Sequence, residues 1–144
     1  MKIRNLRYVV VGLLFLATAI NYADRQMIAV VSTELRAEFG MSEVDYGEVL
    51  AWFMFGYAIM YAGSGPIADR LGTRRAYIFF VVAWSAAAMG HALSFGKWWL
   101  IFWRLMLALA QPGNWTAAAK AVAEWFPPHQ RALGVGIFNS GASM

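Results

Sequence analysis

Long apolar runs separated by short polar or charged stretches make up almost the whole chain. Four of these runs are long enough for an α-helix that crosses the hydrocarbon core of a bilayer, which takes about 20 residues. A fifth apolar run of 13 residues begins close to the end of the sequence. The pattern predicts an all-α membrane protein with four transmembrane helices and the start of a fifth, over residues 8–31, 49–68, 76–93, 98–126 and 132–144.

The amino-acid composition also favours a lipid environment. Of the 144 residues, 60% are hydrophobic and only 14% are charged, whereas soluble domains have about a quarter charged residues. A soluble chain of this size has too little interior to bury so many apolar side chains, so we expect the lipid bilayer to be its solvent. The chain has no cysteine, which excludes disulfides and thiolate metal sites. We expect no metal and no cofactor.

The basic residues indicate how the helices are oriented. The net charge of +4 does not favour nucleic-acid binding, because the basic residues lie at the ends of apolar runs and not in one patch. Seven fall on one side of the predicted membrane, namely Lys2, Arg4, Arg7, Arg70, Arg74, Arg75 and Arg131, against Arg36 and Lys97 on the other. This excess places the N-terminus in the cytoplasm. No A-x-A-like cleavage site follows the first run, so we interpret it as an uncleaved helix and not as a signal peptide.

Polar residues interrupt the first apolar run. Charged side chains within a membrane helix are costly, so they suggest a function. Helical spacing places Asn21, Tyr22 and Arg25 on one face, with Asp24 beside it. Arg25 offers a forked donor for a carboxylate, while Asp24 is either its partner at rest or a carboxyl that gains and loses a proton during transport. The alternative is that both charges anchor the helix at the membrane interface.

A second polar stripe runs along the predicted fourth helix. Arg104, Ala108, Gln111 and Trp115 share one face, and Pro112-Gly113 should kink or unwind the helix beside it. Two arginines on two helices, without a matching excess of acids, indicate a site for an anion. Arg104 could instead make a packing contact with a backbone carbonyl of another helix.

Other polar residues have ordinary explanations. Tyr57 and Tyr61 lie one turn apart in the second run and could either offer hydroxyls to a polyol ligand or pack between helices. Lys120 and Glu124 are spaced for an ion pair within one helix at the interface. The two histidines, His91 and His129, are isolated from each other, and the chain has no nucleotide-binding or hydrolase motif. We therefore expect no enzyme activity.

A compact charged turn joins the second and third runs. Its spacing, G-x-x-x-D-R-x-G-x-R-R, resembles the signature loop of the major facilitator superfamily of secondary transporters. The resemblance implies a gating role for Gly65, Asp69, Arg70, Gly72, Arg74 and Arg75. Asp69 could pair with an arginine of the turn or lie against the positive end of a helix. The alternative is a solvated linker without such a role.

Three stretches together resemble one branch of that superfamily, the anion:cation symporters, and most of all bacterial hexuronate transporters. They are residues 21–25, the charged turn, and residues 111–141 with Glu124-Trp125-Phe126-Pro127 and Arg131. The resemblance implies twelve helices in two halves, so we expect residues 1–144 to be an incomplete N-terminal six-helix half. It also implies a monomer in the bacterial inner membrane that transports a sugar acid with H⁺ or Na⁺ by alternating access.

By the same resemblance, Arg25 would hold the substrate carboxylate with Tyr22 and Tyr57, Asp24 would be the proton-coupled group, and Arg104 would be its partner on the fourth helix. This chain departs from the family at Gln111, where relatives commonly carry a glutamate. A glutamine cannot release a proton, so transport would be coupled through Asp24 alone or would be uniport or exchange. The alternatives are a drug or neutral-sugar carrier of the same superfamily, a small four-helix exporter or scaffold, and an inactive truncated membrane protein.

Overall fold

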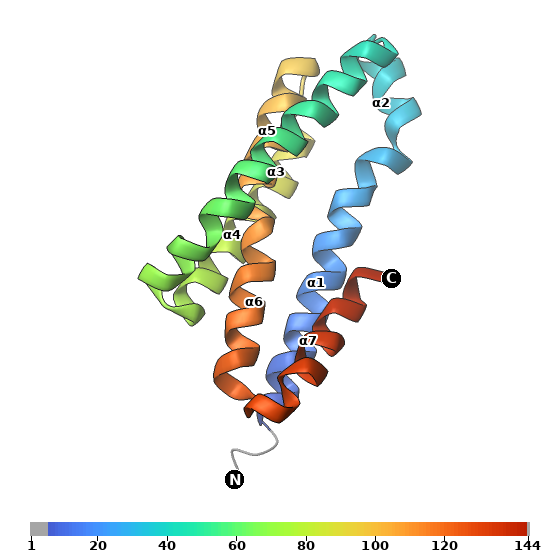
Figure 1. The fold of residues 1–144 in the computed structure, drawn as a ribbon. Coiled ribbons are helices and arrows are strands. Elements are labelled where there is room, and N and C mark those ends of the chain that lie inside the picture. The colour runs from blue at the N-terminus through green and yellow to red at the C-terminus, as the bar shows by residue number, and fades with distance from the viewer. Residues whose placement is uncertain (1–5, 144) are drawn as a thin grey trace.

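The computed structural model describes residues 6–143, and these form a bundle of helices that lie along one long axis (Figure 1). The long elements are α1 (Leu6–Val30), α3 (Glu43–Leu71), α4 (Thr73–Gly90), and the column made of α5 (Lys97–Ala110) and α6 (Pro112–Trp125). A short helix, α2 (Ser32–Glu38), connects α1 to α3, and α7 (Arg131–Ser140) returns beside α1. The 3-10 turns η2 (His91–Leu93), η3 (Pro128–Gln130) and η4 (Gly141–Ser143) follow α4, α6 and α7. Residues 6–143 contain no strand, and the all-α prediction is confirmed.

The second long helix begins before residue 49, where the apolar run was predicted to start. Its first residue is Glu43, because Ser42 caps it. The Ser42 hydroxyl accepts a hydrogen bond from the Asp45 backbone N–H at 3.1 Å, and the Asp45 carboxylate accepts one from the Ser42 N–H at 2.9 Å. This reciprocal capping box satisfies two backbone donors at the helix start, so the helix extends into the polar segment.

The column of α5 and α6 is interrupted at the position where a kink was predicted. Its helix α5 ends at Ala110 and α6 starts at Pro112, since proline has no N–H to continue the ladder. Gln111, between them, keeps helical angles (φ −61°, ψ −41°), so α6 continues the column of α5 (Figure 1).

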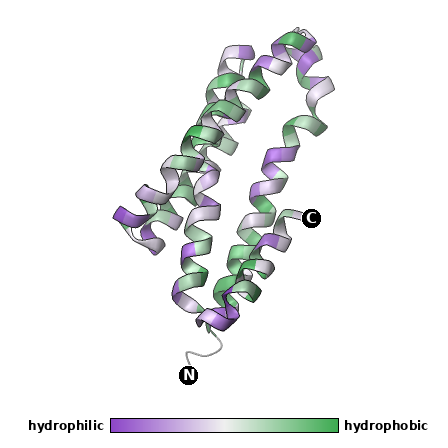
Figure 2. Ribbon diagram, in the orientation of Figure 1, coloured by the Kyte–Doolittle hydropathy of each residue, from purple (hydrophilic) through white to green (hydrophobic). Residues whose placement is uncertain are grey.

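Two of the helical segments, Leu6–Val30 and Thr73–Leu93, are individually long and apolar enough to cross a membrane, each with a mean hydropathy of 1.6. The helices α5 and α6 have 14 residues each, so neither is long enough to cross a membrane by itself. Green, hydrophobic ribbon extends along most of the bundle in Figure 2, with hydrophilic patches at its ends and midway along α1.

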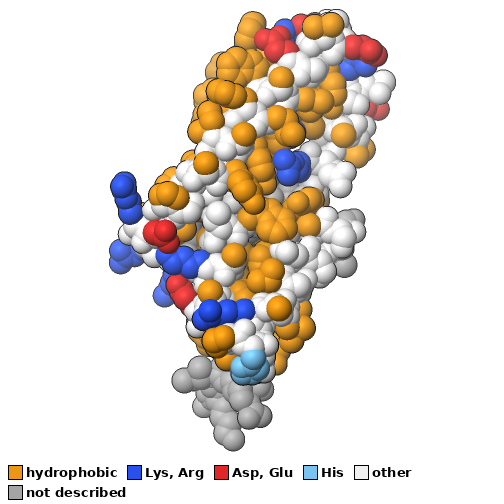
Figure 3. All heavy atoms as spheres, in the orientation of Figure 1, with side chains coloured by type: hydrophobic (Ala, Val, Ile, Leu, Met, Phe, Trp, Pro, Cys, Tyr) orange, Lys and Arg blue, Asp and Glu red, His pale blue; other side chains and the backbone are white. Residues whose placement is uncertain are grey.

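Charged side chains gather at the two ends of the bundle (Figure 3). We call the end with α2 and the start of α3 the acidic end, and the end where α3 meets α4 and α6 meets η3 the basic end. At the acidic end, the Lys97 ammonium lies 2.5 Å from Asp45 and 2.6 Å from Glu48, and Arg36 lies 3.3 Å from Glu43. Apolar side chains cover most of the visible face between the two ends.

Small residues let the central helices pack closely. A Cβ added to Gly113 would lie 2.1 Å from the Phe80 ring, which shows how tightly α6 packs on α4. A Cβ on Gly56 would lie 2.6 Å from Leu105, where α3 packs on α5. Such contacts between small residues and large side chains are a main source of helix association in membranes.

Candidate functional site

Two arginines from different helices meet on one aromatic ring in the middle of the bundle. The Arg104 guanidinium carbon, from α5, lies 4.2 Å from the centre of the Phe53 ring of α3. The Arg25 guanidinium carbon, from α1, lies 5.3 Å from the same ring and 4.3 Å from the centre of the Tyr57 ring. The negative faces of aromatic rings attract cations, so Phe53 and Tyr57 hold both guanidinium groups without neutralising them.

Neither arginine forms an ion pair with an acid in the described part of the chain. Arg104 is only 3% exposed, and its Nε is buried without a hydrogen-bond partner among residues 6–143. A buried cation without a carboxylate pays the full cost of leaving water. The pair of arginines therefore favours an anionic ligand, which would supply the missing negative charge.

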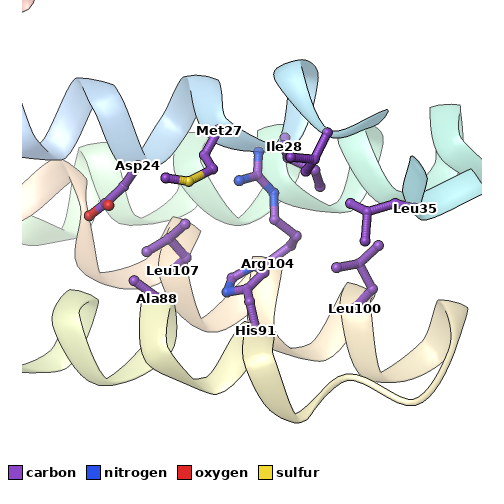
Figure 4. Close-up of a pocket in the computed structure, with 10 residues that line it drawn as sticks. Asp24, Met27, Ile28, Leu35, Ala88, His91, Leu100, Arg104 and Leu107 are labelled. Atoms are coloured by element: carbon purple, nitrogen blue, oxygen red, sulfur yellow. The ribbon is translucent and has the colours of Figure 1, made fainter. Parts of the chain in front are cut away.

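Asp24, a partly buried acid of α1, lines a cavity together with Arg104 (Figure 4). The cavity has a volume of about 190 Å³ and lies between α1, α2, the end of α4 with η2, and α5. Its walls are apolar except for three side chains: Asp24, His91 and Arg104. Asp24 lies at one end of the cavity, and Leu35 and Leu100 lie at the other (Figure 4). Of these three side chains, Asp24 and His91 can bind and release a proton, whereas Arg104 stays charged.

Gln111 is fully buried at 0% exposure and contacts α1 directly. Its Nε2 donates a hydrogen bond to the backbone carbonyl of Asn21 at 3.1 Å. The Asn21 side chain is itself 3% exposed, with a buried Nδ2 that has no partner in residues 6–143. The structure thus brings these two predicted site residues together through the backbone.

The predicted tyrosines lie in three different environments. Tyr22 packs edge-on against Trp115 of α6, with ring centres 6.1 Å apart. Tyr57 is half-buried beside Arg25, and Tyr61 is stacked on Tyr57 at 6.1 Å but is 58% exposed. Of the three, Tyr57 is in contact with an arginine of the site.

A chain of neutral hydrogen bonds connects three helices beneath the site. The Tyr77 hydroxyl of α4 donates to Asn114 Oδ1 of α6 at 2.9 Å, and Asn114 Nδ2 donates to Thr18 Oγ1 of α1 at 3.1 Å. Thr18 and Asn114 are fully buried. Together with the bond from Gln111 to Asn21, this network fixes α1 against the column of α5 and α6 through two polar contacts.

The charged turn joins α3 to α4 at the basic end. Gly72 has a φ of +78°, a backbone region that favours glycine, and it separates the two helices. Asp69 pairs with Lys120 of α6 at 2.8 Å, and not with an arginine of the turn. The predicted ion pair of Lys120 with Glu124 is wrong, because Glu124 instead accepts a hydrogen bond from the Thr73 hydroxyl. Both contacts join the turn to α6.

The other predicted gating residues lie around the same turn. Arg70, Arg74 and Arg75 are exposed and form no ion pair within residues 6–143. Gly65 is half-buried, and a Cβ there would meet no atom within 4 Å.

Sequence reasoning missed two residues of the site, Phe53 and His91. Phe53 has no polar group, but its spacing of four residues from Tyr57 is a signal that an aromatic stripe continues along α3. His91 was judged isolated because its partners come from helices distant in sequence. Only the packing of α4 against α5 brings it to the cavity of Asp24 and Arg104.

Comparison with known proteins gives consistent results. Residues 14–144 match the Major Facilitator Superfamily. The chain is 32% identical over 143 residues to the galacturonate transporter of Dickeya chrysanthemi, covering 99% of this chain and 41% of that protein. It is 33% identical over 144 residues to the hexuronate transporter of Escherichia coli (strain K12), covering 99% and 33%.

A solved structure agrees with the fold. The crystal structure of a bacterial homolog to the human lysosomal transporter Spinster, in an inward-facing and occupied conformation, matches with a TM-score of 0.90 and 27% identity. The match covers 96% of this chain and 30% of that one. The chain thus spans about a third to two-fifths of the length of the curated relatives named above.

These relatives are sugar-acid transporters and not enzymes, in agreement with the resemblance found in residues 21–25, the charged turn and residues 111–141. The family match covers α1 from residue 14 onward, the other long helices, Arg25, Arg104 and the charged turn. The chain belongs to the Major Facilitator Superfamily.

Proposed function

We propose that this chain is part of a secondary transporter for a sugar acid of the hexuronate or aldonate type. The observation that carries the proposal is the pair of guanidinium groups of Arg25 and Arg104, which lie on the ring of Phe53 and form no ion pair with an acid within residues 6–143. A carboxylate ligand would remove the cost of these unpaired charges, and arginine binds carboxylates with two parallel hydrogen bonds. The two relatives named above are a galacturonate transporter and a hexuronate transporter.

Each side chain near the arginines has a role in this proposal. Arg25 binds the substrate carboxylate, and Tyr57, which touches it, offers a hydroxyl to the sugar. Arg104 supplies the second positive charge of the site. Tyr22, Asn21, Tyr61 and Gln111 complete its surroundings on α1, α3 and the column of α5 and α6, with Gln111 acting through the Asn21 backbone.

We also propose that transport is coupled to protons through Asp24. This carboxyl lies in an apolar cavity, has no ion pair in the described residues, and shares the cavity with Arg104. Protonation of Asp24 would remove the negative charge from the cavity that it shares with Arg104, and so make the site more attractive for an anionic substrate. Gln111 cannot exchange a proton, so Asp24 carries the coupling.

The charged turn has a gating role in this proposal, with the basic end in the cytoplasm. Asp69 and Lys120 connect α3 to α6 there, and Gly65, Gly72 and the three arginines of the turn shape and charge the same surface. Opening toward the cytoplasm would break the contact between Asp69 and Lys120. The transporter would have twelve helices, with residues 1–144 in its first half, and would act as a monomer in the inner membrane.

Uptake of labelled galacturonate or glucuronate tests the function. Cells that express the complete reading frame are assayed with and without a protonophore. Uptake that collapses with the proton gradient supports symport through Asp24. Uptake that equilibrates regardless of the protonophore supports transport of the acid but contradicts coupling, and uptake of neither acid contradicts the proposed substrate class.

A further inference from the structure

The two ring nitrogens of His91, which lines the cavity, lie in different environments. His91, at the start of η2, has Nδ1 placed 2.8 Å from the backbone carbonyl of Ala87. A carbonyl only accepts hydrogen bonds, so Nδ1 is the atom that carries the proton in the neutral ring. Nε2 is then the unprotonated nitrogen, and it is buried without a partner among residues 6–143.

Two charged side chains line the same cavity as His91. Asp24, from α1, and Arg104, from α5, line the same cavity, while α2 contributes only the apolar Leu35. The Tyr46 hydroxyl of α3 donates a hydrogen bond to the Ile28 carbonyl at 3.3 Å. Arg104 keeps its charge, so Asp24 and His91 are the two groups of the cavity that can exchange a proton.

His91 lies between the two ends of the cavity. In Figure 4, His91 lies between Asp24 at one end of the cavity and Leu35 and Leu100 at the end toward α2. It also follows the C-terminus of α4, where the backbone dipole favours a positive charge. The volume of about 190 Å³ is enough for several water molecules, which occupy about 30 Å³ each in the liquid.

We propose that His91 is a proton relay between the acidic end of the bundle and Asp24. A proton from water at the acidic end binds the lone pair of His91 Nε2, giving an imidazolium. The same proton then leaves Nε2 through cavity water and binds the Asp24 carboxylate, so the neutral ring is restored. The other proton stays on Nδ1 throughout and is donated in a hydrogen bond to the Ala87 carbonyl. This inference rests on the proposed proton coupling through Asp24, and it adds a residue that acts through Asp24 and does not touch the substrate.

Transport assays can distinguish a proton relay from a purely structural role of His91. The protein encoded by the complete reading frame is reconstituted in proteoliposomes, and uptake of labelled galacturonate is measured. His91→Gln keeps a polar side chain but cannot carry a proton, and His129→Gln, at the basic end, is the matched control. We expect His91→Gln to lower uptake driven by an imposed pH gradient at least tenfold. Exchange of substrate at equal pH, which needs no net proton movement, should stay within twofold of the wild type. Equal losses in both assays, or no loss in either, would overturn the relay.

Nitrogen NMR of the same protein in lipid nanodiscs tests His91 without any transport. The His91 signal is assigned by its loss in His91→Gln. We expect the Nδ1-protonated neutral form at high pH, a cation on acidification, and a titration midpoint that falls when Asp24 is replaced by asparagine. An unprotonated Nδ1, or a midpoint that ignores Asp24→Asn, contradicts the inference. If the wild type transports no sugar acid, the proposed function fails and this measurement alone decides on the relay.

Discussion

The charged residues at the ends of the bundle and those in its middle follow opposite rules. At the ends, both lysines that lie there within residues 6–143 pair with acids: Lys97 contacts Asp45 and Glu48, and Lys120 contacts Asp69. In the middle, Arg25 and Arg104 face aromatic rings and have no acid partner in residues 6–143. Exposed ion pairs cost little to form and contribute little. Unpaired cations within the bundle are expensive, so they mark the place where a charged ligand is expected.

The largest effect should come from removing a central cation. We expect Arg25→Ala to weaken binding of a sugar acid about 100-fold, because a charge-assisted hydrogen-bonded contact to the carboxylate is lost. Equilibrium binding of labelled galacturonate to purified protein measures this loss. Arg36→Ala is the control, since Arg36 pairs with Glu43 at the acidic end and should leave affinity unchanged. Equal affinities for both variants would remove Arg25 from the site.

The next prediction places a titratable group at Gln111. Its Nε2 donates to the Asn21 carbonyl, and in Gln111→Glu only the protonated carboxyl keeps a donor for that carbonyl. We therefore expect uptake by the variant to fall as pH rises, by up to about tenfold per pH unit, the limit for one proton. Uptake measured from acid to neutral pH tests this, with Gln130→Glu at the basic end as control. A pH profile like that of the wild type would show that this position is not coupled to transport.

A smaller effect is expected from the ring between the two arginines. Phe53→Leu keeps an apolar side chain but removes the ring face that attracts both guanidinium groups. We expect substrate affinity to fall about threefold to tenfold, the size of a cation–π contribution. Phe55→Leu is the control, because Phe55 is exposed and contacts Trp52. Similar affinities for the two variants would mean that the ring does not position the arginines.

The smallest effect is expected at the acidic end. Hydrogen bonds from Lys97 and from Ser42 hold the pKa of the Asp45 carboxyl well below its usual range. A depressed pKa means that this acid stabilises the folded state at neutral pH, and that this contribution is lost as pH falls below about 4. Asp45→Asn should lower the unfolding midpoint only slightly at pH 7 and not at all at strongly acidic pH. Uptake should stay within about twofold of the wild type, whereas a large loss would make this end part of the site.

The sequence predicted the elements of the bundle better than their contacts. Apolar runs located the long helices, and Pro112 located the interruption between α5 and α6. The early start of α3 also had a signal, since Ser42 precedes Asp45 at the spacing of a capping box. These features depend on neighbours within a few residues, so a sequence pattern contains them.

Contacts between helices depend on how the helices turn toward one another, and here the sequence was insufficient. Lys120 was assigned to Glu124, one turn away, but it contacts Asp69, which is 51 residues away. Arg25 and Arg104 were both recognised as unusual, yet their meeting on Phe53 depends on how α1 and α5 lie against α3. The environment of His91 was missed for the same reason.

The hydrogen bonds between α1 and α6 have a consequence for motion. Asn114 bonds to Thr18, and Gln111 bonds to the carbonyl of Asn21, so a slide of α1 by a single residue would break both bonds at once. In lipid, no solvent would replace them. We therefore expect α1 and the column of α5 and α6 to move together during the transport cycle.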